Sequence, residues 1–215
     1  MRAYLKLVMR HKWISAYLPI IIGFCILSFS SSYYCDLYAG DFDTIHLYII
    51  PNFHMLVSMM SVWWTILFYS GFVSEQGNEL LFLRFKPNRL MGCQIFLEVL
   101  YVILVFFYFF FVRDTYQLPV SFFYLLAAES FFMNGVVFLL IHLTRSISLS
   151  LGSVALYCVF LLKFDQMDMF GIISIFPNPQ DILETPVHWL LIDMAAAMAC
   201  HVMGRICFQY RKVYF

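Results

Sequence analysis

The stretch Leu90–Val112 reads LMGCQIFLEVLYVILVFFYFFFV and contains a single charged residue, Glu98. A helix of this length can cross the hydrocarbon core of a bilayer, which takes about 20 predominantly apolar residues. Over the whole chain 63% of the residues are hydrophobic and 12% are charged, whereas soluble domains have about 25% charged residues. So few charges cannot cover a water-facing surface, and the composition therefore predicts an integral membrane protein.

Five other segments have a similar apolar character, so we expect an all-α integral membrane protein with six transmembrane helices in a single domain, 1–215. The expected spans are approximately Ile14–Tyr34, Phe53–Val73, Leu90–Val112, Pro119–Leu143, Ile147–Phe164 and His188–Tyr210. The fifth span is the shortest, and Leu47–Pro51 could extend the second span at its outer end. A cleaved signal peptide is the less favoured interpretation of the first segment, because five more spans follow it.

The distribution of Lys and Arg predicts the orientation, because these residues stay on the cytoplasmic side of membrane proteins. With the N-terminus inside, only Arg113 and Lys163 of the 13 Lys and Arg residues fall on the outer side. A five-span arrangement would lose this agreement. We therefore expect a multi-pass protein with cytoplasmic N- and C-termini.

The first residues, Met1–Trp13, have an amphipathic pattern. Apolar residues fall near one helical face and Arg2, Lys6 and Arg10 near another. Such a helix lies in the membrane interface, with its basic residues toward anionic headgroups. We expect an interfacial helix over 1–13, and a plain basic flank is the alternative.

The inner stretch 74–89 joins the second and third expected spans and reads SEQGNELLFLRFKPNR. It is too apolar for a solvated loop and too charged for a membrane span. A short helix at the membrane surface explains both properties. Pro87 would end that helix, because proline cannot continue the hydrogen-bond ladder.

The pattern E-x-G-x-E-L-L followed by P-x-R in this stretch resembles the cytoplasmic loop of type-2 ABC transporter permeases. Asn88 stands where that family usually has Ser or Thr. The resemblance implies a coupling helix over 74–89 that docks into an ATPase subunit. The residues expected to contact the ATPase are Glu75, Gly77, Glu79, Leu80, Leu81, Arg84, Pro87 and Arg89.

The same resemblance implies the permease subunit of a bacterial ABC exporter in the inner membrane. A second permease subunit would complete a homodimer or heterodimer in membrane lipid, and ATP and Mg would bind to the partner ATPase. This chain has no GxxxxGK[ST] loop, so we expect it to bind no cofactor and not to be an enzyme. We expect no nucleic acid partner. The aromatic composition favours a hydrophobic or amphipathic cargo, such as a peptide, lipid or drug.

The outer stretch 165–187 alternates apolar and acidic residues around prolines. Its sequence Phe176-Pro177-Asn178-Pro179 is similar to the Asn-Pro segment that the family folds as short re-entrant helices. We expect an outer re-entrant turn at Pro177, Asn178 and Pro179, and an ordinary outer loop is the alternative.

Polar residues within the expected spans are the candidates for a substrate path or a gate. Glu129 and Asn134 lie near the middle of the fourth span, and Glu98 lies near the inner end of the third. Ionisable residues at this depth are costly, by about 2.5–3.5 kcal/mol on insertion scales, and are often functional. The alternative is a protonated carboxyl bonded to a neighbouring helix, which we favour for Glu98 and leave open for Glu129.

Other features of the spans predict packing. The histidines have no metal-ligand spacing, so we expect no metal site and treat His46, His54, His142, His188 and His201 as interface or packing residues. The small residues Ala195, Ala199, Cys200 and Gly204 favour close helix contacts, within the bundle or across a dimer. The aromatic run Phe106–Phe111 is expected to face lipid or another helix, and a wall for the cargo is its less favoured role.

Two other functional classes stay open. A membrane assembly or binding protein would also use an inner helix, but without ATP-driven transport. An intramembrane enzyme would need catalytic polar groups at one depth, whereas Glu98 and Glu129 are expected at different depths without an evident partner.

Overall fold

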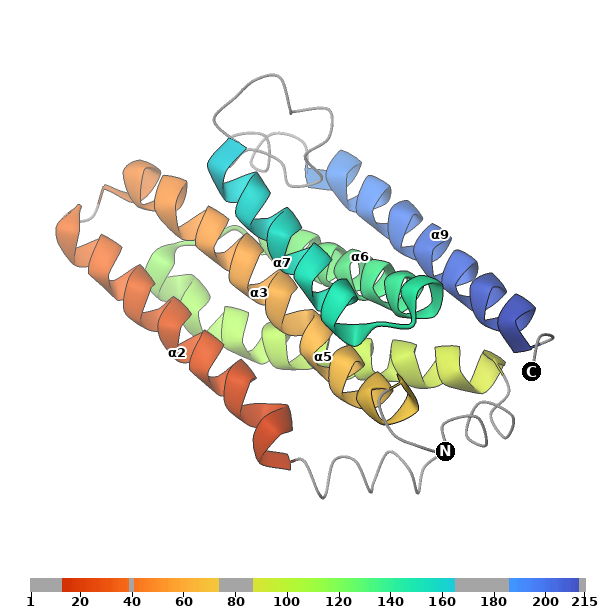
Figure 1. Ribbon diagram of the computed structural model, residues 1–215. Helices are drawn as coiled ribbons and strands as arrows, with labels where there is room; N and C mark the ends of the chain where they lie inside the picture. The colour runs from red at the N-terminus through yellow and green to blue at the C-terminus, as the bar shows by residue number, and fades with distance from the viewer. Residues whose placement is uncertain (1–12, 39–40, 74–86, 165–185, 213–215) are drawn as a thin grey trace.

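The computed structural model describes residues 13–38, 41–73, 87–164 and 186–212, and all regular structure within them is helical. Six helices run alternately up and down (Figure 1). They are α2 (Trp13–Leu37), α3 (Phe42–Val73), α5 (Pro87–Tyr116), α6 (Val120–Thr144), α7 (Ile147–Phe164) and α9 (Pro186–Lys212).

Five of these helices, all except α7, are long and apolar enough to cross a membrane. Helix α7 has 18 residues, and at 1.5 Å per residue it is about 27 Å long. Within the residues whose side chains are described, the apolar part of α7 runs over Ile147–Tyr157. The all-helical, multi-pass membrane character expected from the sequence is therefore confirmed, whereas a sixth complete crossing stays a prediction.

Helix α3 is longer than the expected second span, because it begins at Phe42 and continues through Pro51. The extension buries Ile45, Ile49 and Ile50 on the bundle side. It is also tied to α5, because His46 Nε2 lies 3.0 Å from the carbonyl oxygen of Tyr116. These contacts offset the backbone hydrogen bond that proline cannot make.

The expected coupling helix also needs one correction. Pro87 was expected to end it and Arg89 to contact the ATPase subunit from it, but both residues lie in the first turn of α5, where proline's missing N–H costs no helical hydrogen bond. The rest of that segment lies outside the described residues. The same holds for 1–12 of the interfacial helix and for 165–185 of the outer segment, whose last two residues begin α9.

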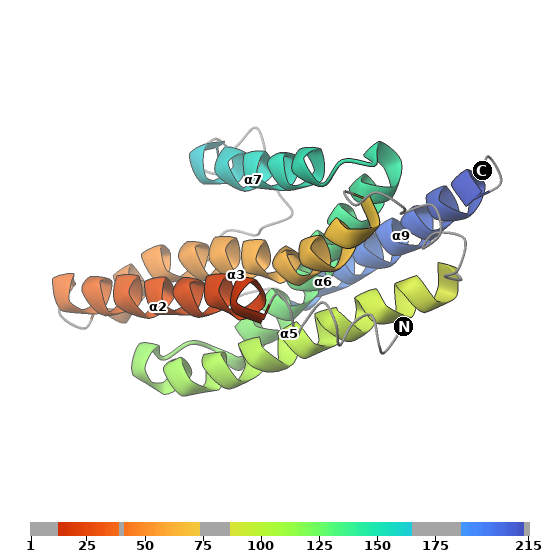
Figure 2. The ribbon, with the colours of Figure 1, turned by 60° about the horizontal axis from the view of Figure 1, so that its bottom comes forward.

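Helix α6 is the centre of the bundle. It contacts α3, α5, α7 and α9, and its contact with α9 is the most extensive of any pair of described helices. Figure 2 shows α7 on the opposite side of the molecule from α5. Helix α2 packs against α3 and α5 at the edge. Polar residues on α6 are therefore removed from lipid.

Close contact between α6 and α9 depends on two glycines. A Cβ atom on Gly204 would lie 2.5 Å from the Phe138 ring, and one on Gly135 would lie 2.9 Å from Nδ1 of His201. Gly204 thus confirms the expected close packing. Ala195 and Ala199 are exposed on the outside of the bundle, so a dimer contact for them stays a prediction.

The aromatic run on α5 faces mainly outward. Phe106, Phe107, Phe110 and Phe111 are exposed. Within the run, Phe109 is buried and Tyr108 stacks on Phe24 of α2 at 4.3 Å between ring centroids. The run therefore combines an outward, apolar face with interhelical packing, as expected.

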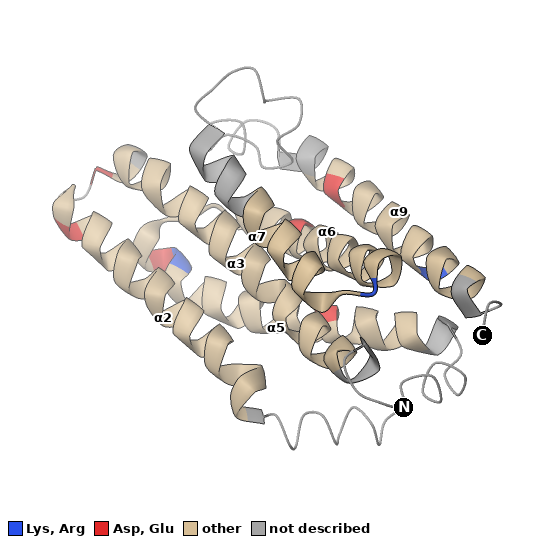
Figure 3. Cartoon of the chain, in the orientation of Figure 1, with Lys and Arg blue, Asp and Glu red and all other residues tan. Residues whose placement is uncertain are grey.

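Apart from the buried Glu98, Glu129 and Asp193, the described charges lie toward the two ends of the bundle (Figure 3). Arg145 directly follows the last residue of α6, and Arg205 lies in the last turns of α9. Both helices finish at the same end of the bundle. The opposite end carries Asp36, Asp41, Arg113 and Asp114. The described helices thus alternate in direction, and their orientation across the membrane stays a prediction.

Candidate functional site

The interior of the bundle contains polar side chains where a membrane protein normally has apolar ones. Those of the candidate site come from α3, α5, α6 and α9. On α3 and α5 they are three or four residues apart, which puts them near one face of the helix. The buried members are His54, Ser58, Ser61, Thr65, Gln94, Glu98, Glu129, Ser130, Asn134, Asp193 and His201.

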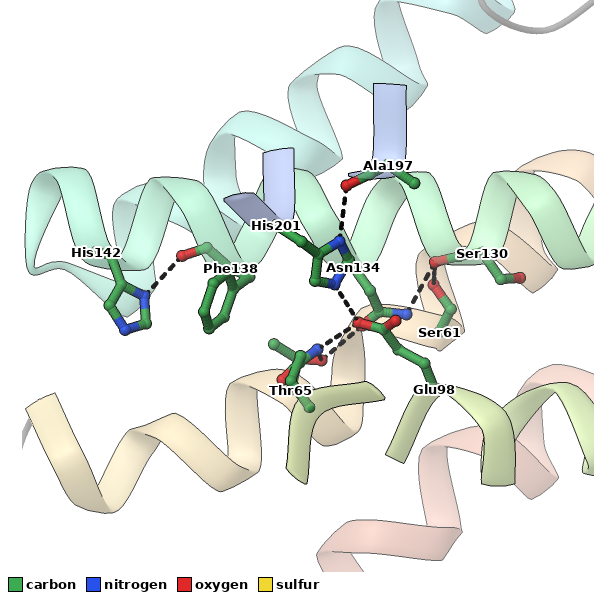
Figure 4. A network of polar contacts seen from close by, with 10 residues as sticks. Ser61, Thr65, Glu98, Ser130, Asn134, Phe138, His142, Ala197 and His201 are labelled. Carbon is green, nitrogen blue, oxygen red and sulfur yellow. Dashed lines mark hydrogen bonds and ion pairs between the residues drawn. The ribbon is translucent and has the colours of Figure 1, made fainter. Parts of the chain in front are cut away.

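Glu98 of α5 and His201 of α9 form the first buried pair, with His201 Nε2 2.9 Å from Glu98 Oε1 (Figure 4). His201 Nδ1 lies 2.8 Å from the carbonyl oxygen of Ala197. Because a carbonyl only accepts, Nδ1 carries a hydrogen. The contact between Nε2 and the carboxyl therefore holds one shared proton when the pair is neutral.

A chain of hydrogen bonds extends from this pair to α3 and α6. Gln94 donates from Nε2 to Glu98 Oε1 at 2.9 Å and to Thr65 Oγ1 at 2.5 Å. Thr65 donates to Asn134 Oδ1 at 2.5 Å, and Asn134 donates to the carbonyl oxygen of Ser130 at 2.9 Å. The first pair and this chain of hydrogen bonds together connect α3, α5, α6 and α9.

Glu129 of α6 and His54 of α3 form the second buried pair, with His54 Nδ1 2.5 Å from Glu129 Oε1. Ser58 donates to the other carboxyl oxygen of Glu129 at 3.3 Å. The His54 ring packs on Phe122, with 4.9 Å between centroids. The Glu129 carboxyl therefore has one contact to the histidine and one hydrogen bond from Ser58 among the described residues.

Asp193 of α9 lies near the second pair. It is fully buried, and neither of its carboxyl oxygens has a hydrogen-bond partner among the described residues. It interacts electrostatically with Glu129. Asp193 thus adds a second acid beside the pair of Glu129 and His54.

Of the predicted site residues, the structure brings Glu98 and Asn134 into one network and places Glu129 in a second cluster. The sequence offered no evident partner for either glutamate, and the structure pairs each with a histidine of a neighbouring helix, in line with the contact favoured for Glu98 and left open for Glu129. The interpretation of His54 and His201 as interface or packing residues was incomplete for the same reason. Sequence reasoning missed Asp193 as well. A signal for His54 existed in the polar spacing His54, Ser58, Ser61 and Thr65 on one face of α3.

These groups can exchange protons and hold polar ligands. Among the described residues, no three His, Cys, Asp or Glu side chains are arranged to hold a metal ion. Buried ionisable groups of this kind mark ion, proton or substrate paths in membrane proteins.

The other predicted site residues lie outside the described residues. They are Glu75, Gly77, Glu79, Leu80, Leu81, Arg84, Pro177, Asn178 and Pro179. No protein family, curated protein or solved structure matches the chain.

Proposed function

We propose that this chain is the permease subunit of a bacterial ABC exporter, driven by a separate ATPase chain. The observation that carries the proposal is the loop sequence 74–89, with its acidic, glycine, leucine and P-x-R pattern. The loop connects α3 and α5, two long apolar helices. It does so at the end of the bundle that carries Arg145 and Arg205, as the positive-inside rule requires of a cytoplasmic loop.

The coupling would act through α3 and α5. Closure of the ATPase subunits on ATP moves the loop, and the loop moves the inner ends of both helices. Thr65 of α3 and Gln94 of α5 share a hydrogen bond, and Glu98 connects α5 to α9. Displacement of the loop therefore reaches the polar network and changes how α9 packs on the bundle.

The pathway would form with a second permease subunit, as a homodimer or a heterodimer. In the membrane-spanning parts of α2, α5 and α9 most residues are not buried inside the bundle, which leaves room for both lipid and a second subunit. The outward aromatic face of α5 supports a hydrophobic or amphipathic cargo, such as a peptide, lipid or drug.

The first test is purification of the tagged chain from native membranes under mild solubilisation and crosslinking, with the bound proteins identified by mass spectrometry. We expect an ABC-type ATPase in stoichiometric amount. A clean preparation without an ATPase would contradict the proposal.

The second test changes the loop directly. Replacing Leu80→Glu and Leu81→Glu together should remove the ATPase from the complex, because charges replace the apolar side of the docking helix. The matched control, Leu80→Met with Leu81→Met, should keep the ATPase bound. If the Glu variant still binds the ATPase and transports, residues 80 and 81 have no coupling role.

One observation favours an intramembrane enzyme as a second candidate. Each buried glutamate has a histidine beside it, and a carboxyl with an imidazole can act as a general acid and base. Under this alternative, Glu129→Gln or Glu98→Gln should abolish turnover of a lipid or peptide substrate by the purified chain without an ATPase. The absence of an ATPase from the purified complex is the result that would favour it.

A further inference from the structure

The strongest unexplained feature of the bundle is the group His54, Glu129 and Asp193, which we call the acid cluster. The three residues come from α3, α6 and α9. Glu129 and Asp193 are fully buried, and His54 is 4% exposed. The proposed coupling to an ATPase does not require any of them.

We propose that the acid cluster is a proton-binding site whose occupancy controls how α9 packs against α3 and α6. Asp193 carries this inference, because its two buried oxygens have no hydrogen-bond partner among the described residues and it faces the charge of Glu129. An ionised carboxyl in that position would be isolated from water and opposed by a second carboxyl.

The charge count gives the number of protons. With protonated His54 and both acids ionised, the acid cluster carries a net charge of minus one. A second proton makes it neutral, either as imidazolium, carboxylate and carboxylic acid or as three neutral groups. Because an uncompensated charge is costly inside a membrane, the packed bundle holds two protons here, and one of them is exchangeable.

Among the described residues, the charged group that acts on Asp193 is Glu129, which is itself an acid. Helix α5, which contacts α6 and α9, contributes Glu98, and this acid is paired with His201. Helix α7, which packs on α3 and α6, contributes the buried hydroxyl of Tyr157. Neither group supplies a positive charge to Asp193.

The acid cluster is placed where it can change helix packing. Gly135 and Gly204 bring α6 and α9 into close contact, and these two helices carry Glu129 and Asp193, which interact electrostatically. Loss of the exchangeable proton leaves two carboxylates and one imidazolium there. Repulsion between α6 and α9 then favours a looser arrangement.

Infrared difference spectroscopy of the full chain in detergent micelles tests the site without any ATPase or cargo. As the pH is raised, the wild type should lose a protonated-carboxyl band equivalent to one group per chain. Asp193→Asn should remove that step, and the control Glu98→Gln should retain it. An unchanged band in Asp193→Asn, or no titrating carboxyl in the wild type, would overturn the proposal.

Two further measurements test the same site. Thermal unfolding should show wild-type stability falling as pH rises, because the folded state binds more protons than the unfolded state, and Asp193→Asn should flatten this dependence. If Asp193→Asn does not fold, Glu129→Gln carries the same test. Replacement of choline, used as the buffer cation, by sodium or potassium should leave the pH at which the carboxyl band disappears unchanged. A change of that pH with either ion would show a metal cation site instead.

Discussion

The two buried glutamate–histidine pairs differ in how their charges and hydrogen bonds are balanced. Glu98 faces one histidine and accepts a further hydrogen bond from Gln94, and both ring nitrogens of His201 are bonded. Glu129 faces His54 but receives only a 3.3 Å hydrogen bond from Ser58. It shares its surroundings with Asp193, an acid without a described partner.

This difference separates a structural contact from an exchange site. A pair with one acid and one base is neutral with a single proton and can stay closed throughout a cycle. Two acids beside one base need a further proton to be neutral, and that proton can leave. On α9 the residues of the two sites, Asp193 and His201, are eight positions apart, which is about 12 Å along the helix axis.

The largest expected effect comes from breaking the neutral pair. Glu98→Leu should lower the free energy of unfolding by about 3 kcal/mol, because removing one partner of a buried ion pair leaves the other uncompensated. The double variant with Glu98→Leu and His201→Leu should lower the free energy of unfolding by less than the sum of the two single variants. Unfolding by denaturing detergent measures both. Additive losses would show that the two residues do not act as a pair.

A smaller effect should follow from crowding one site only. A Cβ atom on Gly135 would lie 2.9 Å from His201 Nδ1 and 3.1 Å from the Ala197 carbonyl oxygen. Gly135→Ala should therefore cost about 1–2 kcal/mol, as overpacked cores do, and leave the titration of the acid cluster in place. Gly152→Ala is the matched control, because its Cβ would meet nothing within 4 Å. It should gain stability, and equal losses in both variants would exclude a specific clash.

The smallest effects should come from single hydroxyl groups, one beside each site. Thr65→Val cuts the bonds to Gln94 and Asn134, which are both 2.5 Å long, and should cost about 0.6 kcal/mol for each bond, the average for interhelical hydrogen bonds in a membrane. Ser58→Ala removes only the 3.3 Å bond to Glu129 and should cost less. The same unfolding assay compares them. A larger loss for Ser58→Ala would mean that the Glu129 site depends on its serine.

The sequence by itself determined the helical elements closely. The expected span Ile147–Phe164 coincides with α7, and Leu90–Val112 lies within α5. This works because the thickness of the apolar layer and the helical rise fix how many consecutive apolar residues a span needs. The number of consecutive apolar residues in each segment can be counted directly in the sequence.

Only the tertiary structure decided which polar residues meet. His201 and Glu98 are 103 positions apart, and no pattern in the sequence pairs them or connects Asp193 with Glu129. Partners depend on how each helix is rotated about its axis, and close packing at Gly135 and Gly204 sets that rotation for α6 and α9. Hydropathy describes what faces lipid on average, whereas the pairing of charges inside the bundle depends on contacts between helices that are distant in the sequence.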